Sequence, residues 1–311
     1  MQSPNTPEIT EIQFIRHLLP EIREYLLSRN KTPDLPLQTL PLLSDKIRGI
    51  PRKCLTVIGA RTSEGKSTFA CQIAHDLSSQ GFTVLFLSLE MTSVKIGARL
   101  YCYQQKVPNT TAFAGGVKDM PDTLNKFEIA TKMLPLVIND FIGKNWQDID
   151  ELVSNTELNP DVIIVDYIQT ISKSAKTEMD SINEYIRHFR ELAIRKNFAG
   201  IICSQLNRTK QDSDSKEPQL HQLKSSGFIE EHADLVILLH WPYKYDNRNI
   251  NSFSCFIAKN KDGSTGYHKL RFIPEVYLFS EAPEEDKQEK IKFKPELLQQ
   301  TTQQQETNWD E

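Results

Sequence analysis

Short apolar runs that give way to polar residues recur along the middle of the chain. The clearest of them lie at 55–58, 83–89, 162–165, 199–203 and 235–239. Runs of this length without regular polar alternation are typical of strands that are buried on both faces of a parallel sheet. Between them lie stretches with apolar residues at helical spacing, such as 182–198. The pattern predicts an α/β fold around a mostly parallel central sheet.

The first run leads directly into GARTSEGKS at 59–67 and then into a helix-compatible stretch. In this context, backbone N–H groups and the helix N-terminus point at a phosphate, while Lys66 neutralises the β and γ oxygens and the Ser67 hydroxyl ligates Mg²⁺. The sequence therefore predicts ATP and Mg²⁺ as ligands. Ala60 stands where the general motif has glycine, so an ordinary loop containing Gly-Lys-Ser is the alternative. The residues predicted to bind the nucleotide are Ala60, Arg61, Thr62, Ser63, Glu64, Gly65, Lys66, Ser67 and Thr68.

A polar side chain follows each of the next three runs. Glu90 comes after the second run, at the strand end where ligands bind in such sheets, and is the candidate general base for the attacking water. A surface glutamate in the first turn of the next helix is the alternative. Asp166 ends the third run and is predicted, with Ser67, to hold Mg²⁺. Gln205 follows the fourth run and can hydrogen-bond the γ-phosphate or its water.

Composition narrows the class of protein. The 311 residues are 39% hydrophobic and 25% charged, which suits one sizeable domain with appendages or at most two domains. The net charge of −4 argues against a protein that coats duplex DNA. No apolar run approaches the roughly 20 residues that span a bilayer, and no signal peptide precedes the first run, so we expect a cytoplasmic protein with no membrane contact. The five cysteines lack C-x-x-C spacing, which favours free thiols over a metal site.

The two ends of the chain differ from its middle. Residues 8–30 carry apolar residues at helical spacing, and 31–40 contain two prolines. We therefore expect a helix and a linker over 1–40 and an ATPase domain over 41–281. Residues 282–311 are rich in Gln and charged residues, which predicts a disordered tail.

A hairpin and a polar stretch complete the pattern. Strands are predicted at 254–258 and 267–272, so that Lys259 and Lys261 lie at the turn between them. On position alone, two such lysines are solvated charges. The polar stretch 209–218 beside a nucleotide site is either a functional loop or a disordered one.

Taken together, the motifs resemble those of the RecA-fold motor domain of the DnaB-type replicative DNA helicase family. Their order is GARTSEGKS, LSLEM, VIIVDYIQ, SQLNR, SSGFIEEHADLVILL and IAKNKDGSTGYHKLRF, and the resemblance covers residues 41–280. It implies a RecA-like P-loop NTPase fold, and Ala60 in the loop is family-like. The helix EIQFIRHLLPEIREYLL resembles the family's linker helix, which packs on the adjacent subunit of a hexameric ring. We expect the family's N-terminal primase-interacting domain to be missing, because only about 40 residues precede the motor.

The resemblance also implies roles for single residues. Lys66 and Ser67 would hold phosphate and Mg²⁺, Glu90 would be the base, Asp166 would lie in the Mg²⁺ shell, and Gln205 would couple the γ-phosphate to DNA-contacting loops. Lys259 and Lys261 would reach into the neighbouring subunit's ATP site, where the family has a lysine and an arginine. A lysine there keeps the charge but loses the planar fork.

One DNA-contacting loop departs from the family pattern. This chain has Lys224-Ser225-Ser226-Gly227 where the family has Arg-Glu-Ser-Gly, which changes the set of contacts to phosphate. The residues predicted to contact DNA are Arg208, Lys210, Lys224 and Gly227.

The function predicted from these features is ATP-driven translocation on single-stranded DNA as a ring or spiral homo-oligomer, a hexamer by the resemblance. Replication, plasmid or phage proteins would be further partners. The first alternative is a RecA-fold ATP-binding module that assembles or regulates a partner without unwinding DNA, which the changed DNA loop, Lys261 and the net charge favour. A recombinase-type strand-exchange ATPase is a second alternative, which the linker helix and SQLNR speak against.

Overall fold

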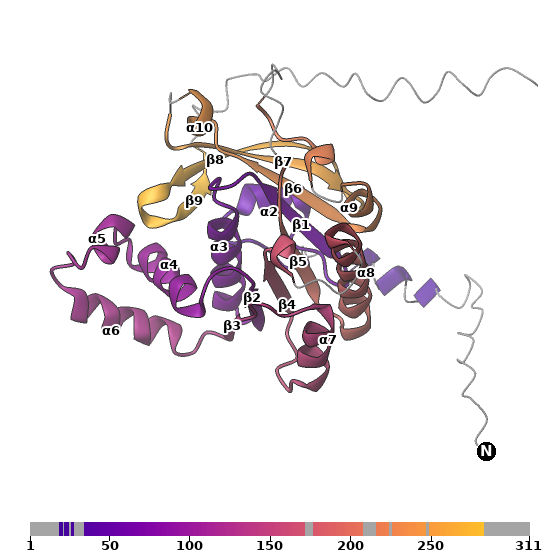
Figure 1. The fold of residues 1–311 in the computed structure, drawn as a ribbon, viewed down its shortest axis with the longest axis horizontal. Coiled ribbons are helices and arrows are strands. Elements are labelled where there is room, and N and C mark those ends of the chain that lie inside the picture. Colours follow the sequence, from indigo (N-terminus) through magenta and orange to yellow (C-terminus); the bar gives the residue numbers. More distant parts are fainter. Residues whose placement is uncertain are drawn as a thin grey trace, which may run out of the picture.

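A single mixed sheet organises the structure, a computed structural model that describes residues 19–20, 22–24, 26–27, 34–171, 177–207, 216–223, 226–246 and 249–282 (Figure 1). The order across its nine strands is β3-β2-β4-β5-β1-β6-β7-β8-β9. Strands β1 to β6 pair in parallel, and β7 to β9 continue the sheet in antiparallel pairs. The predicted α/β architecture with a mostly parallel sheet is confirmed.

Five of the strands, β1, β2, β4, β5 and β6, coincide with the apolar runs. The bounds of the strands are β1 Leu55–Ala60, β2 Val84–Ser88, β3 Leu136–Asp140, β4 Val162–Asp166, β5 Ala199–Gln205, β6 Leu235–His240, β7 Ser252–Asn260, β8 Gly266–Ile273 and β9 Leu278–Glu281. The predicted hairpin is β7 and β8, which pair in antiparallel register. The runs lack polar alternation because helices cover both faces of the parallel strands. In β4, Ile164 faces one core cluster while Ile163 and Val165 face the other.

The helices divide between the two faces of the sheet. Helices α2 (Pro41–Ile47), α3 (Lys66–Ser79) and α4 (Ser93–Gln105) bury residues in one core cluster, and α7 (Trp146–Asn155), α8 (Glu178–Lys196) and α9 (Ser226–His232) bury residues in the other. Helices α5 (Asn109–Phe113) and α6 (Met120–Thr131) form a lobe beside α4, and α10 (Tyr243–Asp246) follows β6. The short helical turns are η1 Ile168–Thr170, η2 Leu220–Gln222 and η3 Pro274–Val276.

Residues 34–40, which the sequence predicts as part of a linker, pack against the folded domain. Leu35, Leu37 and Leu40 are 0%, 1% and 1% exposed and belong to the core cluster around α3. The Ile50 N–H donates to the Leu35 carbonyl at 2.9 Å, which ties this segment to the end of α2. The expectation of a linker up to residue 40 was therefore wrong for 34–40. The proline at 36 is compatible with burial because the leucines on either side of it face the core.

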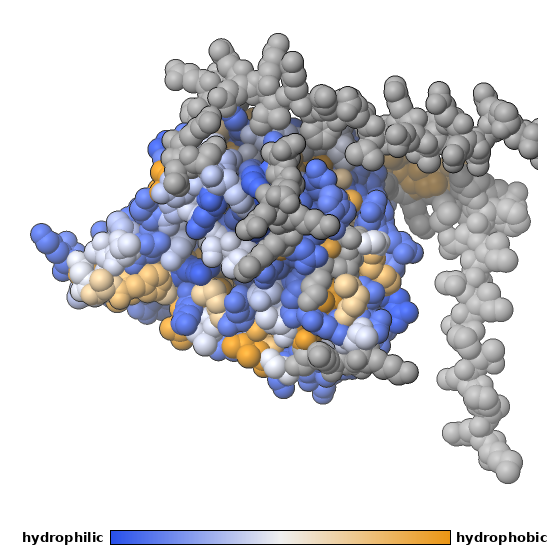
Figure 2. Space-filling model, turned by 45° about the horizontal axis from the view of Figure 1, so that its top comes forward, coloured by the Kyte–Doolittle hydropathy of each residue, from blue (hydrophilic) through white to orange (hydrophobic). Residues whose placement is uncertain are grey.

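The two ends of the chain lie largely outside the described residues. Of the helix predicted over 8–30, residues 19–20, 22–24 and 26–27 are helical, and their leucines are about half exposed. The predicted tail lies outside the described part from residue 283 onward. Among the helices that the structure describes, none has the length and apolar composition needed to cross a membrane. The visible surface is largely hydrophilic, with small hydrophobic areas that include one on the lobe of α5 and α6 (Figure 2).

Candidate functional site

The phosphate-loop motif forms a strand, a loop and a helix, as the sequence predicts. Strand β1 ends at Ala60 and α3 begins at Lys66. Gly65 has φ +80°, and a Cβ there would lie 3.0 Å from Phe279 Cζ, so both backbone and space require glycine. No side chain of the described residues caps the start of α3. Its first N–H groups are therefore available to an anion, which the helix dipole also favours.

An open pocket of about 720 Å³ lies in front of this loop, at the carboxyl ends of the parallel strands. The predicted residues that line it are Arg61, Thr62, Ser63, Gly65, Lys66, Ser67, Thr68, Glu90 and Gln205. Ala60, Glu64 and Asp166 do not line it. The Ala60 side chain lies in the core at the end of β1, and the Glu64 carboxylate turns toward the Tyr245 hydroxyl.

Lys66, which lines the pocket, forms an ion pair with the buried Asp166. Lys66 Nζ lies 2.7 Å from Asp166 Oδ1, and the two side chains are 11% and 2% exposed. Burial alone would lower the pKa of Lys66, but the Asp166 carboxylate outweighs it and the pKa is raised, so the ammonium is charged. The same ammonium lies 4.3 Å from the centre of the Tyr167 ring. The pair places an ammonium and a carboxylate side by side.

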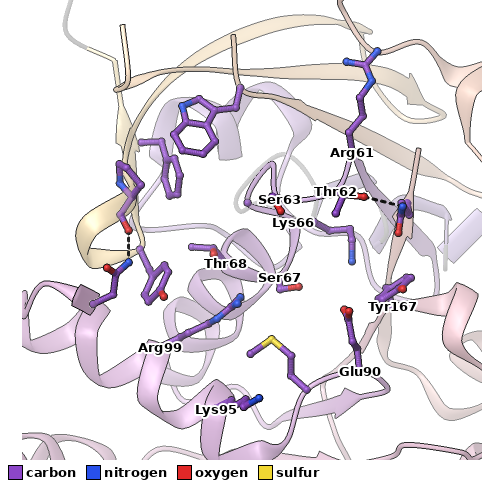
Figure 3. Close-up of a pocket in the computed structure, with 18 residues that line it drawn as sticks. Arg61, Thr62, Ser63, Lys66, Ser67, Thr68, Glu90, Lys95, Arg99 and Tyr167 are labelled. Carbon is purple, nitrogen blue, oxygen red and sulfur yellow. Dashed lines mark hydrogen bonds between the residues drawn. The ribbon is translucent and has the colours of Figure 1, made fainter. Parts of the chain in front are cut away.

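Ser67 and Glu90 point toward the same space as the Lys66 ammonium (Figure 3). A serine hydroxyl and a buried carboxylate are hard oxygen donors, and Mg²⁺ keeps several waters and needs few protein ligands. The Ser67 and Asp166 side chains therefore fit a Mg²⁺ ion bound together with phosphate. Glu90 is exposed two residues after the end of β2 and lines the pocket, where a carboxylate can reach a water.

Gln205 connects the end of β5 to the phosphate loop. Its Nε2 donates to Thr62 Oγ1 at 2.9 Å, the dashed line beside Thr62 in Figure 3. Its backbone N–H donates to Gln169 Oε1 at 3.1 Å, and Gln169 Nε2 donates to Ser204 Oγ at 2.8 Å. Gln205 therefore links the phosphate loop to the end of β5 and to Gln169.

Lys259 and Lys261 lie at the opposite edge of the sheet. Lys259 pairs with Val236 at the start of β6, whereas the pocket lies beyond the end of β1, which runs parallel to β6. Lys261 Nζ lies 2.6 Å from Asp234 Oδ1, and Lys259 Nζ donates to the Glu230 carbonyl. Neither lysine lines this chain's own pocket. Their action on a neighbouring chain's pocket stays a prediction.

The predicted DNA-contacting residues are mostly beyond what the structure describes. Arg208, Lys210 and Lys224 lie outside the described residues. Gly227 is described and is exposed near the start of α9.

The sequence reasoning missed the far end of the pocket. Arg99, Asn109, Trp241 and Tyr277 line it, from α4, α5, the end of β6 and the turn before β9. The Arg99 guanidinium lies 5.4 Å from the centre of the Tyr277 ring, and Asn109 Nδ2 donates to the Pro274 carbonyl at 3.0 Å. Flat aromatic and guanidinium surfaces suit a nucleobase. No local motif marks these residues, because only the tertiary fold brings them together.

Known proteins are similar to this chain over most of its length. The replicative DNA helicase DnaB of Geobacillus stearothermophilus is 28% identical over 242 residues, which cover 74% of this chain and 53% of that protein. The probable plasmid replicative DNA helicase of Chlamydia psittaci is 33% identical over 241 residues, which cover 72% of this chain and 50% of that protein. The chain thus spans about half the length of the curated relatives it matches.

A solved structure of a DnaB-like replicative helicase superposes with a TM-score of 0.78 at 24% identity and covers 88% of this chain and 68% of that one. This likeness confirms the predicted RecA-like α/β fold. The family model of the DnaB-like helicase C-terminal domain matches residues 38–281, which is most of the chain. The chain therefore belongs to the family of the DnaB-like helicase C-terminal domain.

Proposed function

We propose that this chain is the motor of an ATP-dependent DNA helicase that moves along single-stranded DNA. The observation that carries the proposal is the convergence of Lys66, Ser67, Glu90 and Gln205 on one open pocket at the carboxyl ends of the strands. Cation, hydroxyl, carboxylate and amide are the parts that phosphoryl transfer from ATP to water requires. The family assignment supports the link from hydrolysis to DNA.

Each residue has a task in this proposal. The N–H groups at the start of α3 and the Lys66 ammonium bind the β- and γ-phosphates of ATP. Lys66 then exchanges Asp166 for phosphate oxygen, which frees the carboxylate for the metal shell. Mg²⁺, held by Ser67 and Asp166, would supply charge neutralisation at the phosphates. Glu90 accepts the proton of the attacking water.

The far end of the pocket suits the base of the nucleotide. Tyr277 and Arg99 offer a stacking surface, and Asn109 keeps a carbonyl oxygen available beside its bond to Pro274. The phosphate loop and this end lie in the same cavity, which its volume of about 720 Å³ makes large enough for a whole nucleotide.

We infer a homo-oligomer, a hexameric ring or a spiral, with ATP sites between subunits. The position of Lys259 and Lys261 at the edge opposite the pocket supports this, because such residues reach a triphosphate only in another chain. Apolar side chains are also exposed on the N-terminal helix, with Leu19 at 56% and Leu26 at 56%, and on α6, with Ile129 at 75%. Contact between two copies would cover such surfaces.

Single-stranded DNA would be bound by the side chains of Arg208, Lys210 and Lys224 and by the backbone at Gly227. The protein would act in the cytoplasm, together with other replication proteins. A basic side chain contributes to such binding through phosphate, which makes the affinity salt-dependent.

One observation favours a second function, a nucleotide-binding assembly or regulatory module that does not unwind DNA. Lys261 occupies the position expected of an arginine finger and is paired with Asp234 of its own chain. A lysine lacks the planar fork that grips a phosphate in two places.

The test is steady-state ATP hydrolysis by the full chain with and without single-stranded DNA. We expect DNA to stimulate hydrolysis, and Glu90→Gln to lower kcat by about 100-fold or more while ATP still binds. Glu128→Gln, the same change at an exposed position of α6, is the matched control and should leave kcat unchanged. Hydrolysis that is absent in the wild type, or indifferent to DNA while ATP binds, would favour the assembly module.

A further inference from the structure

Two neighbouring residues of the phosphate loop contact the end of β5 and a segment of the chain that follows β5. Thr62 Oγ1 accepts a hydrogen bond from Gln205 Nε2 at 2.9 Å. Arg61 donates from one terminal nitrogen to the Lys216 carbonyl at 2.6 Å and from the other to Gln222 Oε1 at 3.3 Å. The Arg61 guanidinium points away from Lys66 and Ser67 (Figure 3). Its backbone therefore belongs to the loop that faces phosphate, while its side chain belongs to the surface segment 216–222.

The guanidinium is held in place from a third side. It lies 3.0 Å from the Tyr245 hydroxyl and 5.5 Å from the centre of that ring. The Tyr245 hydroxyl in turn donates to Glu64 Oε1. We call Arg61, Tyr245 and Glu64 the Arg61 brace. It begins and ends in the phosphate loop, so it fixes the guanidinium relative to the residues that flank the phosphates.

Glu64 makes the brace sensitive to charge in the pocket. Glu64 is 2% exposed, so water hardly reaches its carboxylate. Burial raises the pKa of Glu64, whereas hydrogen bonds from Tyr245 and the Trp241 backbone and the charges of Arg61 and Lys244 oppose that rise. A triphosphate on the same loop adds negative charge close to this carboxylate. The energy of the ionised Glu64, and with it the hold on Arg61, must therefore change when nucleotide binds.

The segment that Arg61 holds is also tied back to the end of β5. The Asn207 N–H donates to the Gln222 carbonyl at 2.8 Å, and Leu206 forms an antiparallel bridge with Leu223. A shift of residues 216–222 therefore moves together with the start of the polar segment that leaves the sheet. Gln205 acts on the outgoing end of this segment and Arg61 on the returning end.

We propose that Arg61 is a positioning residue that couples nucleotide occupancy of the pocket to the position of residues 216–222, with Tyr245 and Glu64 orienting its guanidinium. The inference rests on the proposed function in one respect, that the pocket binds a nucleoside triphosphate. The coupling is reciprocal, so whatever binds and fixes 216–222 also changes the affinity for nucleotide.

Hydrogen exchange of the backbone amides in 216–223, with and without a non-hydrolysable ATP analogue and Mg²⁺, tests the coupling in the full chain. In the wild type we expect the analogue to change the exchange rate of these amides by about tenfold. In Tyr245→Phe, which removes the shared hydroxyl and keeps the ring, the change should fall to less than half. Arg61→Lys keeps the charge but loses the planar fork that reaches two partners. In this variant too, most of the change in exchange rate should be lost. Tyr243→Phe, the same change on the same helix, should behave as the wild type.

Two measurements distinguish nucleotide binding by the pocket from its coupling to residues 216–222. A titration with a fluorescent ATP analogue shows first whether the wild type binds nucleotide, and a failure there overturns the proposed function and the coupling with it. If nucleotide binds but the exchange of 216–223 does not respond, the coupling alone is wrong. If Tyr245→Phe and Arg61→Lys respond as fully as the wild type, Arg61 is only a structural residue.

Discussion

Two lysine–aspartate pairs lie at opposite edges of the central sheet. Lys66 and Asp166 meet at 2.7 Å beyond the carboxyl ends of β1 and β4, with exposures of 11% and 2%. Lys261 and Asp234 meet at 2.6 Å at the amino end of β6, with exposures of 41% and 9%. The chemistry is the same and the distances differ by little, but water reaches the second lysine and hardly reaches the first. This difference decides what each lysine can do.

A buried lysine leaves its partner only for another anion. Without one, a charged ammonium or carboxylate would remain unpaired in a poorly solvated site, which costs several kcal/mol. We therefore expect Lys66 to stay paired with Asp166 until a phosphate binds. A half-exposed lysine can leave at a cost below about 1 kcal/mol because water replaces its partner. We therefore expect Lys261 to exchange readily between Asp234 and an anion bound to another chain.

The largest expected effect comes from the same substitution at both edges. Lys66→Met should lower the free energy of unfolding by about 3 kcal/mol, because it leaves Asp166 buried without its cation. It should also weaken ATP binding by about 100-fold through the lost charge-assisted bond to phosphate. Lys261→Met should cost less than about 1 kcal/mol in stability and leave ATP binding to the isolated chain unchanged. Urea unfolding and a nucleotide titration of each variant measure both quantities.

The Asp166→Asn, Lys66→Met double variant is the control. If the loss of stability comes from the unpaired carboxylate, removing its charge should recover most of it. Equal losses from Lys66→Met and Lys261→Met would contradict the argument that burial separates the two pairs.

A smaller effect, on activity alone, is expected from the exposed pair. Lys261→Ala should lower hydrolysis by about tenfold or more if the lysine completes a neighbour's ATP site. Lys66→Ala should be inactive by itself. Mixing the two variants in equal amounts should restore activity, because about a quarter of the interfaces then join an intact Lys66 to an intact Lys261.

A mixture that is no more active than the sum of its parts would show that the two lysines do not meet in one site. Lys269→Ala, on β8 of the same hairpin, is the matched control. Mixing it with Lys66→Ala should give no more than the activity of the Lys269→Ala chains alone.

The edge around Lys66 was predictable from the sequence, because its signals are local. An apolar run, a glycine-containing loop and a helix follow one another in the chain, and Asp166 and Gln205 each end an apolar run. In a parallel sheet, neighbouring strands bring their carboxyl ends to one edge, so separate strand ends predict one site. The contact between Lys66 and Asp166 joins residues far apart in the sequence, yet two local patterns were enough to predict that they lie close together.

The contacts made by side chains between layers were not predictable. Arg61 and Glu64 were both assigned to the nucleotide, yet Glu64 turns to Tyr245, which lies far along the chain and carries no motif. Strand β9 was missed because four residues give too short a pattern. Residues 34–40 were assigned to a linker because the two prolines of 31–40 were given more weight than its three leucines, which are buried. In each case a tertiary contact overrides what the local pattern indicates.

The smallest effect, the pH dependence of the exposed pair, sharpens the comparison furthest. Burial favours the neutral form of Asp234, but hydrogen bonds from Lys261 and the Leu55 N–H and the charge of Arg190 outweigh it, so its pKa is lowered. An unfolded aspartate titrates near about 3.9, so the ionised form stabilises the fold above that pH, and this contribution is lost as the pH falls through the lower folded pKa. The stability difference between wild type and Asp234→Asn should be constant from about pH 5 to pH 7 and shrink below about pH 4, by about 1 kcal/mol at most given the exposure of Lys261. In a Lys261→Met background the shrinkage should be smaller, since one of the bonds that lower the pKa is gone. A difference that grows on acidification would mean that Asp234 is held neutral, and the second pair would then not be an ion pair at all.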